Sequence, residues 1–380
     1  MKILLNGLPV VYPISGVGTY TLQLGRSLEA LLGPEKIFWF GKDLSHYSET
    51  FYDTTRSGFI DRIRYKLKNE LRKIPGLKKV VHIGRNNQFR SFTLRIKPSL
   101  YHETNYVPFC FENGPTVVTI CDLSFIRHPE WHPLDRVKYF EKYCLKRLSQ
   151  VEAVITISEF TKKEMLTLLN VDQAKIYITP LGVDGSFSPG EKKLTGLPDK
   201  YILYLGNLEP RKNLPMLLSA FRRLPGNLQD RYSLVMAGAK GWCTNELGEM
   251  LRSFQKDGKL ILTGYVPQTQ LPKLYRGASL FVYPSLYEGF GLPVIEAMAS
   301  GVPVVASNTT SLPEVVGDAG ILVSPHDVEG WNNAMNRILN DEEMRSEMSQ
   351  KGLARATLFS WEKCAQETVA VYKKVLGSRR

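Results

Sequence analysis

Short apolar runs alternate with helical patterns along the whole chain, and this alternation constrains the fold more than any other feature of the sequence. It is typical of parallel sheets covered by helices, because parallel strands need long crossover connections and are buried on both faces. A first group of predicted strands is KILLN (2–6), IFWF (37–40), TVVTI (116–120) and AVITIS (153–158). A second group is YILYLG (201–206), YSLVMAG (232–238), LILTG (260–264), LFVYP (280–284) and PVVAS (303–307). An α/β protein with two parallel sheets is therefore predicted.

The two groups of strands indicate two domains. Between them SFSPGEKKLTGLPDK (186–200) is polar and rich in Gly and Pro, as linkers are. A chain of 380 residues is long enough for two cores of ordinary size. We expect a first domain over 1–190, a second over 191–358 and a final helix over 359–380. Two such sheets would face each other across a cleft, where ligands bind beyond the carboxyl ends of the strands.

Neither a membrane span nor a metal site is predicted. No apolar run reaches the roughly 18 residues needed to cross a bilayer, and the start MKILLNGLPVVYPISG has the pattern of a buried strand rather than of a signal peptide. A cytoplasmic protein is therefore expected. The five cysteines are scattered and lack paired metal spacing such as C-x-x-C, which favours reduced thiols and no zinc.

The positive charge of the chain is concentrated in one stretch. The formal net charge is +12, and residues 61–97 carry twelve basic against two acidic residues. Apolar residues recur there at steps of three and four, namely Ile60, Ile63, Leu67, Leu71 and Ile74. One apolar stripe with basic flanks favours a helix that lies on an anionic membrane surface. The alternatives are a surface helix with a solvated basic face and a nucleic-acid contact, which no recognised motif accompanies.

The segment YEGFGLPVIEAMASGVPVV (287–305) contains a glycine turn followed by a helix signal. Gly289 and Gly291 permit backbone angles that other residues disfavour, and Pro293 suits the first turn of a helix. A helix is therefore predicted to begin near Leu292. The unpaired backbone N–H groups at such a start, together with the helix dipole, favour a bound phosphate.

Two carboxylates lie on either side of this turn. Glu296 would lie one turn into the helix, where a carboxylate can accept hydrogen bonds from a pair of sugar hydroxyls. Glu288 would lie across the turn. In the structural alternative, Glu296 complements the helix dipole and Glu288 caps the loop.

A second glycine turn follows the first predicted strand. ISGVGTYTLQLG runs through Gly16 and Gly18 into a helix and could hold a phosphate. The dinucleotide fingerprint G-x-G-x-x-G is incomplete, because Thr21 stands at its third glycine. A plain strand-to-helix turn is therefore an equally good interpretation.

Two cations follow the strand at 201–206. In GNLEPRKNLP, Arg211 and Lys212 precede a helix whose first turn would hold Pro215. They could neutralise a diphosphate, Arg as a fork and Lys as a point charge, or they could be ordinary surface cations. A glycine-bounded helix start, a pair of cations and a pair of carboxylates all follow strands of the second group. Together they predict a diphosphate with sugar hydroxyls on both sides, that is, a nucleotide-sugar.

With these segments the chain resembles glycosyltransferase family four, whose members are retaining enzymes of the GT-B fold. The resemblance implies two Rossmann-like doubly wound domains that face each other across a cleft. It covers nearly the whole chain and is strongest over 201–325. The matching segments are SGVGTY, TICDLSF, ITISEFTK, PLGVD, YLGNLEPRKNL, LTGYVPQTQLPKLYRGASLFVYPSLYEGFGLPVIEAMASG and SLPEVVGDAGILV. The E-x7-E spacing of Glu288 and Glu296 is the most specific signal.

The resemblance implies roles for the matching residues. Arg211 and Lys212 would hold the donor diphosphate, Glu296 would accept hydrogen bonds from the nucleotide ribose, and Glu288 would meet the donor sugar. The other implied donor contacts are the backbone N–H groups of Phe290, Gly291 and Leu292, the turn Gly264, Tyr265 and Val266 beside the base, and Gly16, Val17 and Gly18 at the diphosphate in the closed cleft. The first domain would select the acceptor, and the final helix (359–380) would pack back onto it.

One segment departs from the family pattern. Family members usually carry His-Asp where this chain has Cys121 and Asp122. A thiol is a weak hydrogen-bond donor and cannot replace an imidazole at a sugar hydroxyl. His102, at the end of the strand-like SLYH, could supply the missing group or could make a structural hydrogen bond. The predicted catalytic residues are therefore Glu288, Asp122 and His102.

The sequence contains no D-x-D triplet, so no metal or other cofactor is predicted, and cations with helix dipoles would stabilise the leaving diphosphate. Retention follows from the resemblance. A front-face route, in which the leaving phosphate helps to take the acceptor proton, needs no protein nucleophile. A double displacement would need a carboxylate beside the anomeric carbon, and Glu288 is the candidate for it.

NLEPRKNL and HETNYVP resemble segments of bacterial enzymes that build O-antigen polysaccharides from GDP-mannose or GDP-D-rhamnose. Together with the basic stripe, this implies a lipid-diphosphate-linked glycan acceptor and peripheral binding at the inner face of the cytoplasmic membrane. A UDP-sugar donor is the near alternative, and Cys121 leaves open an inactive relative that binds a nucleotide-sugar without turnover. If the chain were a nicotinamide dehydrogenase, the two cations and the two glutamates would have no evident function. A phosphorylase would need pyridoxal phosphate on a lysine.

Overall fold

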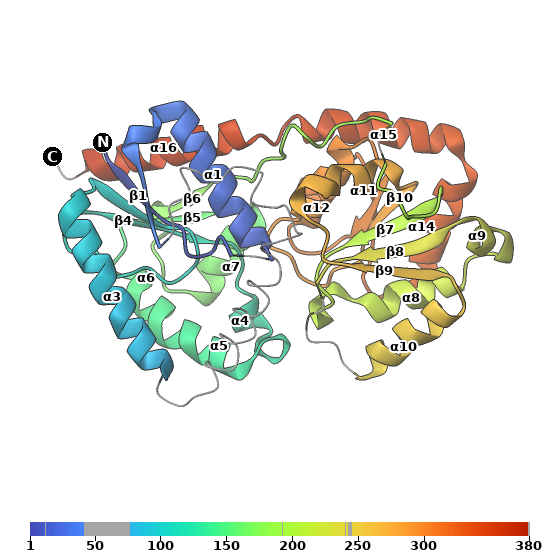
Figure 1. The fold of residues 1–380 in the computed structure, drawn as a ribbon, viewed down its shortest axis with the longest axis horizontal. Coiled ribbons are helices and arrows are strands. Elements are labelled where there is room, and N and C mark those ends of the chain that lie inside the picture. The colour runs from blue at the N-terminus through green and yellow to red at the C-terminus, as the bar shows by residue number, and fades with distance from the viewer. Residues whose placement is uncertain (12, 42–76, 192, 240, 242–244, 379–380) are drawn as a thin grey trace.

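The computed structural model describes residues 1–378 apart from 12, 42–76, 192, 240 and 242–244. The apolar stripe predicted over 60–74 lies outside the described residues, so its contact with a membrane stays a prediction. Within the described ranges, no helix is both long and apolar enough to cross a membrane. The chain forms two lobes that lie side by side, each built on one sheet (Figure 1).

The first lobe has a six-stranded sheet in which every pair of neighbours is parallel. In spatial order its strands are β2 (Ile37–Phe40), β1 (Ile3–Asn6), β3 (Leu100–Glu103), β4 (Thr116–Ile120), β5 (Ala153–Thr156) and β6 (Ile176–Ile178). β1, β2, β4 and β5 are buried along nearly their whole length, which explains why these strands form continuous apolar runs in the sequence. β6 has three residues and is too short to stand out in the sequence.

Helices cover both faces of this sheet. α1 (Gly16–Leu32) and α16 (Trp361–Gly377) pack together on one face, and Figure 1 shows α3 (Leu77–Ile96) and α5 (Leu134–Phe140) on the other. Other helices among the described residues of this lobe are α4 (Ser124–Arg127), a π-helical turn (Glu141–Leu145), α6 (Lys146–Leu148) and α7 (Glu159–Leu168).

The second lobe repeats this plan with a six-stranded parallel sheet. Its spatial order is β12 (Ile321–Val323), β11 (Val304–Ser307), β10 (Leu280–Tyr283), β7 (Tyr201–Leu205), β8 (Ser233–Ala237) and β9 (Leu260–Gly264). This is the order of a doubly wound Rossmann sheet, which reverses between β7 and β10. The first sheet reverses between β1 and β3, so both lobes are doubly wound, as predicted.

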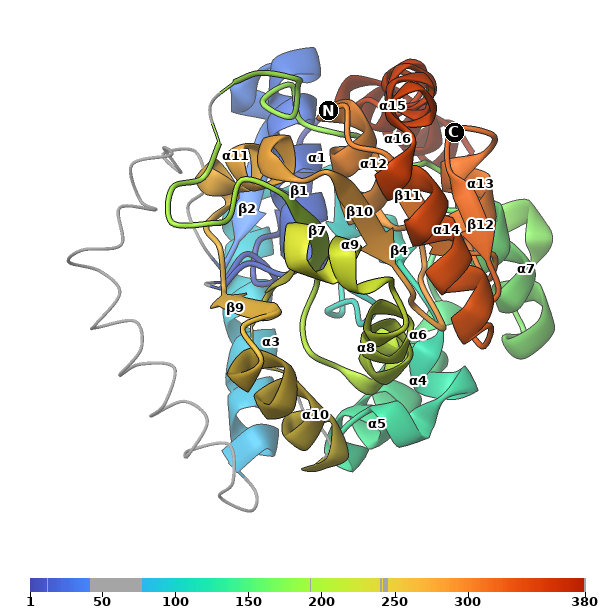
Figure 2. The same ribbon diagram turned by 90° about the vertical axis from the view of Figure 1, so that its right-hand side faces the viewer.

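The second sheet also lies between two layers of helices. α8 (Leu214–Arg222), α10 (Asn245–Lys256) and α14 (Val328–Asn340) cover one face, and α11 (Leu271–Gly277) and α12 (Leu292–Ala299) cover the other. Figure 2 shows α8 and α10 below the strands and α11 and α12 above them. The remaining helices are α9 (Gly226–Arg231), α13 (Leu312–Val316) and α15 (Glu342–Ala356).

The chain passes between the lobes twice. The described part of 186–200 contains neither helix nor strand and leads from the first lobe to the second. The chain returns near Ser360, which forms a parallel bridge with Val183, and α16 then lies along α1 (Figure 1). The Ser360 side chain caps α16 by accepting a hydrogen bond from the backbone N–H of Lys363.

Candidate active site in the interdomain cleft

A cavity of about 370 Å³ lies between the lobes. Its walls come from segments that follow strands of both sheets, which is the expected place for a ligand in doubly wound folds. The predicted site residues that line it are Gly16, Val17, Asp122, Arg211, Lys212, Tyr265, Val266, Glu288, Phe290, Gly291, Leu292 and Glu296. The fold therefore gathers most of the predicted site in one cavity.

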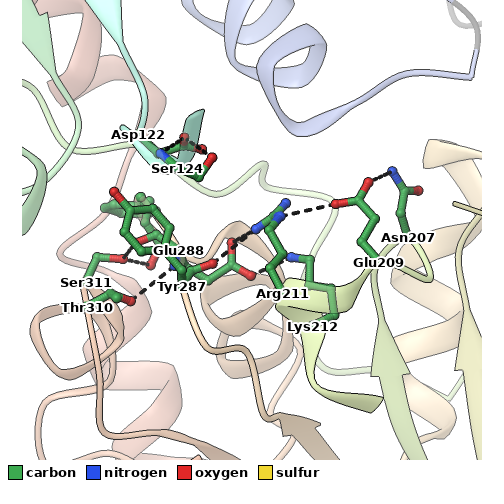
Figure 3. Close-up of polar contacts among 12 residues, drawn as sticks. Asp122, Ser124, Asn207, Glu209, Arg211, Lys212, Tyr287, Glu288, Thr310 and Ser311 are labelled. Carbon is green, nitrogen blue, oxygen red and sulfur yellow. Dashed lines mark hydrogen bonds and ion pairs between the residues drawn. The ribbon is translucent and has the colours of Figure 1, made fainter. Parts of the chain in front are cut away.

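The cations and the first glutamate meet because β7 and β10 are neighbours at the point where the strand order reverses. Arg211 and Lys212 follow β7, and Glu288 follows β10. Arg211 Nη1 donates to Glu288 Oε2 at 2.9 Å, and Lys212 Nζ donates to Glu288 Oε1 (Figure 3). Lys212 also donates to the Tyr283 hydroxyl at 2.7 Å.

This ion pair determines the charge of Glu288. Burial alone would raise the pKa of its carboxyl, but the charges of Arg211 and Lys212 outweigh burial and lower that pKa to about 2. The pKa of Lys212 is itself lowered, first by burial and then by the adjacent Arg211. Glu288 is thus an anion that already accepts hydrogen bonds from two cations.

A second carboxylate, absent from the sequence prediction, completes the network. Glu209 accepts from Arg211 Nε at 3.1 Å and from Asn207 Nδ2 at 3.2 Å (Figure 3). Asn207 and Glu209 both line the cavity and lie in the predicted cation segment GNLEPRKNLP. Two carboxylates therefore balance two cations, so the site presents ordered charges to a ligand rather than an excess of positive charge.

The loop before α12 is held by the segment that follows β11. The Ser311 hydroxyl contacts the backbone oxygens of Glu288 and Phe290 at 2.9 Å, and Glu288 N donates to Thr310 Oγ1 at 3.1 Å. α12 begins at Leu292, as predicted, after Gly291 with φ of 116°. The backbone there faces the cavity in an orientation that these contacts maintain.

Gly289 serves a different purpose from the one predicted. Its φ is not in the left-handed region, so its role in the turn is not a special backbone angle. A Cβ at this position would lie 1.9 Å from the backbone oxygen of Cys121, which belongs to the other lobe. Glycine therefore allows the second lobe to approach the first.

Glu296 lies inside the cavity wall and is only 6% exposed. The Tyr275 hydroxyl donates to Glu296 Oε2 at 2.8 Å. Burial raises the pKa of the Glu296 carboxyl to about 8, although this hydrogen bond lowers it. Burial therefore favours the protonated form of this carboxyl.

Two predicted glycines lie outside the cavity lining. Gly18 is buried, and its backbone N–H donates to the N-cap hydroxyl of Ser15 at 3.3 Å, so this N–H group already has a partner. Gly264 is exposed at the end of β9 with φ of 69°. In contrast, Tyr265 reaches across the cleft, because its hydroxyl accepts from Ile14 N at 3.3 Å.

His102 was predicted to reach the acceptor, and its position in the structure contradicts this. His102 is completely buried in β3 and does not line the cavity. Its Nδ1 is 2.7 Å from the hydroxyl of Tyr372 in α16, and its Nε2 is 2.7 Å from Thr119 Oγ1. Burial lowers the pKa of His102 to about 3. It is a neutral structural group that joins α16 to the first sheet.

The wall that the first lobe contributes carries Asp122, whose carboxylate accepts two hydrogen bonds from one residue. Asp122 Oδ1 accepts from Ser124 N at 3.0 Å and from Ser124 Oγ at 2.7 Å (Figure 3). His132 Nε2 lies 3.0 Å from Ser124 Oγ, and all three residues line the cavity. Cys121 lies beside them, and burial raises the pKa of its thiol. The prediction missed His132, because the HPEWHP stretch (128–133) that contains it offered no functional signal.

No group of three or more His, Cys, Asp or Glu side chains within the described residues could hold a metal ion. The expected independence from metal stays a prediction.

Family models match the two lobes separately. Residues 14–187 match the model described as Glycosyltransferase Family 4, and residues 191–355 match Glycosyl transferases group 1. The O-antigen chain mannosyltransferase B of Escherichia coli is 36% identical over 388 residues, which cover 98% of this chain and 100% of that protein. This chain belongs to glycosyltransferase family four. It is a glycosyltransferase of the GT-B fold.

Other relatives match part of the chain, and solved structures share its fold. The serotype-specific mannosyltransferase WbdA of Escherichia coli is 33% identical over 63% of this glycosyltransferase and 31% of its own length. Sucrose-phosphate synthase from Thermosynechococcus elongatus has the same fold, with a TM-score of 0.74 at 19% identity over both full chains. WaaG, a glycosyltransferase involved in lipopolysaccharide biosynthesis, matches with a TM-score of 0.65 at 12% identity over 98% of this chain and 99% of its own.

Proposed function

We propose that this enzyme is a retaining mannosyltransferase of O-antigen synthesis, which moves mannose from GDP-mannose to a lipid-diphosphate-linked glycan. The full-length similarity to the O-antigen chain mannosyltransferase B carries the proposal. Two further relatives, WbdA and an MMP alpha-(1->4)-mannosyltransferase, also have mannose in their names. GDP-D-rhamnose, whose sugar is 6-deoxymannose, and UDP-sugars are the donors to test against it.

In this proposal the second lobe binds the donor. Arg211 and Lys212 bind the diphosphate together with the backbone N–H groups of Phe290, Gly291 and Leu292. Glu296 binds the ribose hydroxyls, and Tyr265 with Val266 borders the base. Glu288 accepts from a sugar hydroxyl while it holds both cations, because each carboxylate oxygen has two lone pairs. Gly16 and Val17 approach the diphosphate from the first lobe.

Transfer then follows the front-face route. The acceptor oxygen bonds to the anomeric carbon on the face from which the diphosphate departs, and the acceptor proton passes to the departing phosphate oxygen, which gives GDP. Arg211 and Lys212 stabilise the charge that develops on the diphosphate. Glu288, held by two cations, is a poor nucleophile, which favours this route over a double displacement.

A donor panel tests the proposal. Purified enzyme is incubated with GDP-mannose, GDP-D-rhamnose or several UDP-sugars and a short lipid-diphosphate-linked acceptor, and products are identified by mass. We expect a hexose mass gain with GDP-mannose. Transfer from a UDP-sugar alone would overturn the donor assignment, and saturable donor binding without transfer would identify an inactive relative.

We also propose that the enzyme binds peripherally to the inner face of the cytoplasmic membrane, whose surface is anionic. In α3, Arg85, Arg90 and Arg95 are exposed, and Leu94 is 57% exposed. We expect sedimentation with vesicles that contain phosphatidylglycerol at low salt, and its loss at high salt. Charge reversal of the three arginines should weaken binding, whereas reversal of Arg222 and Arg223 in the second lobe should not. Equal binding by all variants would contradict a role for α3.

A further inference from the structure

The hydrogen-bonded chain from Asp122 through Ser124 to His132 has a defined direction. Ser124 is buried and has one hydroxyl hydrogen, which the 2.7 Å contact assigns to the Asp122 carboxylate. The Ser124 oxygen must then accept from His132 Nε2 at 3.0 Å. His132 therefore carries its proton on Nε2, and the chain runs from imidazole to hydroxyl to carboxylate.

The surroundings of His132 keep it in this form. Its ring lies on that of Phe125, with centroids 4.4 Å apart, and Phe125 stacks on Phe140. Its Nδ1 is buried and has no hydrogen-bond partner among the described residues. An imidazolium would need an acceptor for a second N–H there, so the neutral Nε2–H form is favoured.

The charges around His132 oppose one another. Asp122 and Glu209 favour the imidazolium, whereas Arg136 and Arg211 disfavour it. Burial is the largest influence, and it lowers the pKa of His132. A neutral donor at Nε2 is consistent with the geometry of the ring.

We propose that His132 is a positioning residue, which acts through Ser124 to hold the Asp122 carboxylate in its reactive orientation at the cleft. Both Ser124 contacts are on Oδ1, so they orient the whole carboxylate toward the cavity. This arrangement takes the place of the imidazole that the family carries where this chain has Cys121. The inference rests on the proposed function, because Asp122 then binds a hydroxyl of the acceptor or of the transferred sugar.

Steady-state kinetics of three variants test the role. His132→Phe keeps a ring against Phe125 but removes the donor, and His132→Gln restores a donor near the position of Nε2. We expect His132→Phe to lower kcat roughly tenfold to a hundredfold because Asp122 is misplaced, with little change in donor KM. His132→Gln should recover most of kcat. His326→Phe is the matched control, because His326 is exposed in the second lobe and does not line the cavity.

A double variant separates positioning from an independent effect. If His132 acts through Ser124, then Ser124→Ala combined with His132→Phe should be no slower than Ser124→Ala alone. The proposal would be overturned if the loss of kcat in the double variant equals the product of the two single losses. An unchanged kcat in His132→Phe would also overturn it. Thermal melting of each variant identifies losses of kcat that come from unfolding.

The chain can also be observed without any substrate. Nitrogen-15 NMR of the full-length enzyme should show His132 as the neutral Nε2–H tautomer at neutral pH, and Ser124→Ala should change its Nε2 shift. An Nδ1–H tautomer would overturn the proposal even if transfer is normal. The expected tautomer in an enzyme that transfers no sugar would instead place the failure in the proposed function.

Discussion

At the scale of single residues, the candidate donor site is an ionic network in which each charge has an opposite partner. Glu288 lies between Arg211 and Lys212, and Glu209 holds the other side of Arg211. Such a network keeps both cations in place, so little side-chain freedom would be lost if they bind a diphosphate as proposed.

The network predicts that a double substitution can restore stability without restoring donor binding. Lys212→Met keeps the volume of the side chain but leaves buried Glu288 with one cation, so the free energy of unfolding should fall by about 2 kcal/mol. Lys212→Met with Glu288→Gln restores neutrality, so its unfolding free energy should return toward that of the wild type while donor binding stays weak. Denaturant unfolding and donor titration measure both quantities. Equal destabilisation of the single and double variants would contradict the ionic balance.

Glu296 predicts a pH-dependent stability. Burial raises its pKa to about 8, so the folded chain retains a proton that the unfolded chain loses at lower pH. Its contribution to stability is therefore full below the unfolded pKa, which is about 4.3, and is lost as the pH rises through the folded pKa. Glu296→Gln keeps the acceptor for Tyr275 and removes the titration. The difference in stability between this variant and the wild type should therefore shift by a few kcal/mol in favour of the variant from pH 5 to pH 9. Melting curves measured at both pH values test this. The same difference at pH 5 and at pH 9 would contradict the prediction.

At the scale of secondary structure, the loop before α12 was largely predictable from its own residues. Pro293 in the first turn and Gly291 with positive φ are local signals, and the helix begins at the predicted residue. The loop partners Thr310 and Ser311 lie beyond β11, and no local pattern links them to Glu288. They are near because α12 and β11 return the chain to the same end of the sheet.

The same loop makes Gly289→Ala an informative variant. The added Cβ would meet the Cys121 backbone oxygen at 1.9 Å, so the loop and the first lobe must separate. We expect turnover to fall at least about tenfold, with a cost in stability of about 1–3 kcal/mol. Gly226→Ala, in a helix with no atom near the new Cβ, should leave turnover unchanged. Normal turnover in Gly289→Ala would mean that the approach of the lobes is not required.

At the scale of the whole molecule, Tyr287 makes a direct contact between the lobes. Its hydroxyl donates to Glu164 Oε2 at 2.7 Å and accepts from Leu123 N at 3.1 Å. Arg127 pairs with the other oxygen of Glu164. Glu288 follows Tyr287 in sequence, so the interdomain contact and the proposed donor site share one loop.

This contact predicts how the lobes respond to loss of one hydroxyl. Tyr287→Phe leaves the Glu164 oxygen and the Leu123 N–H without this partner, at a cost of about 1–3 kcal/mol. We expect a larger radius of gyration by small-angle scattering and a lower kcat. Tyr232→Phe is the control, because the Tyr232 hydroxyl contacts Leu339 within the second lobe. The same change in radius for both variants would argue against a specific role for Tyr287.

The sequence by itself determined the features that are local. Apolar runs mark strands because buried parallel strands need continuous apolar side chains, and Gly291, Pro293 and the adjacent Arg211 and Lys212 mark strand-to-helix turns at their own positions. For this reason the two-lobe α/β fold, the start of α12 and the position of the two cations after β7 were predictable. The family resemblance supplied the roles proposed for these residues.

Only the tertiary structure decided which side chains meet. His102 follows a strand-like run in the sequence, yet α16, which begins more than 250 residues later, covers it and pairs its ring with Tyr372. Gly18 donates to its own N-cap, and His132 reaches Asp122 through Ser124. A hydrogen-bond partner is a matter of distance and direction in space, and packing of distant segments determines both.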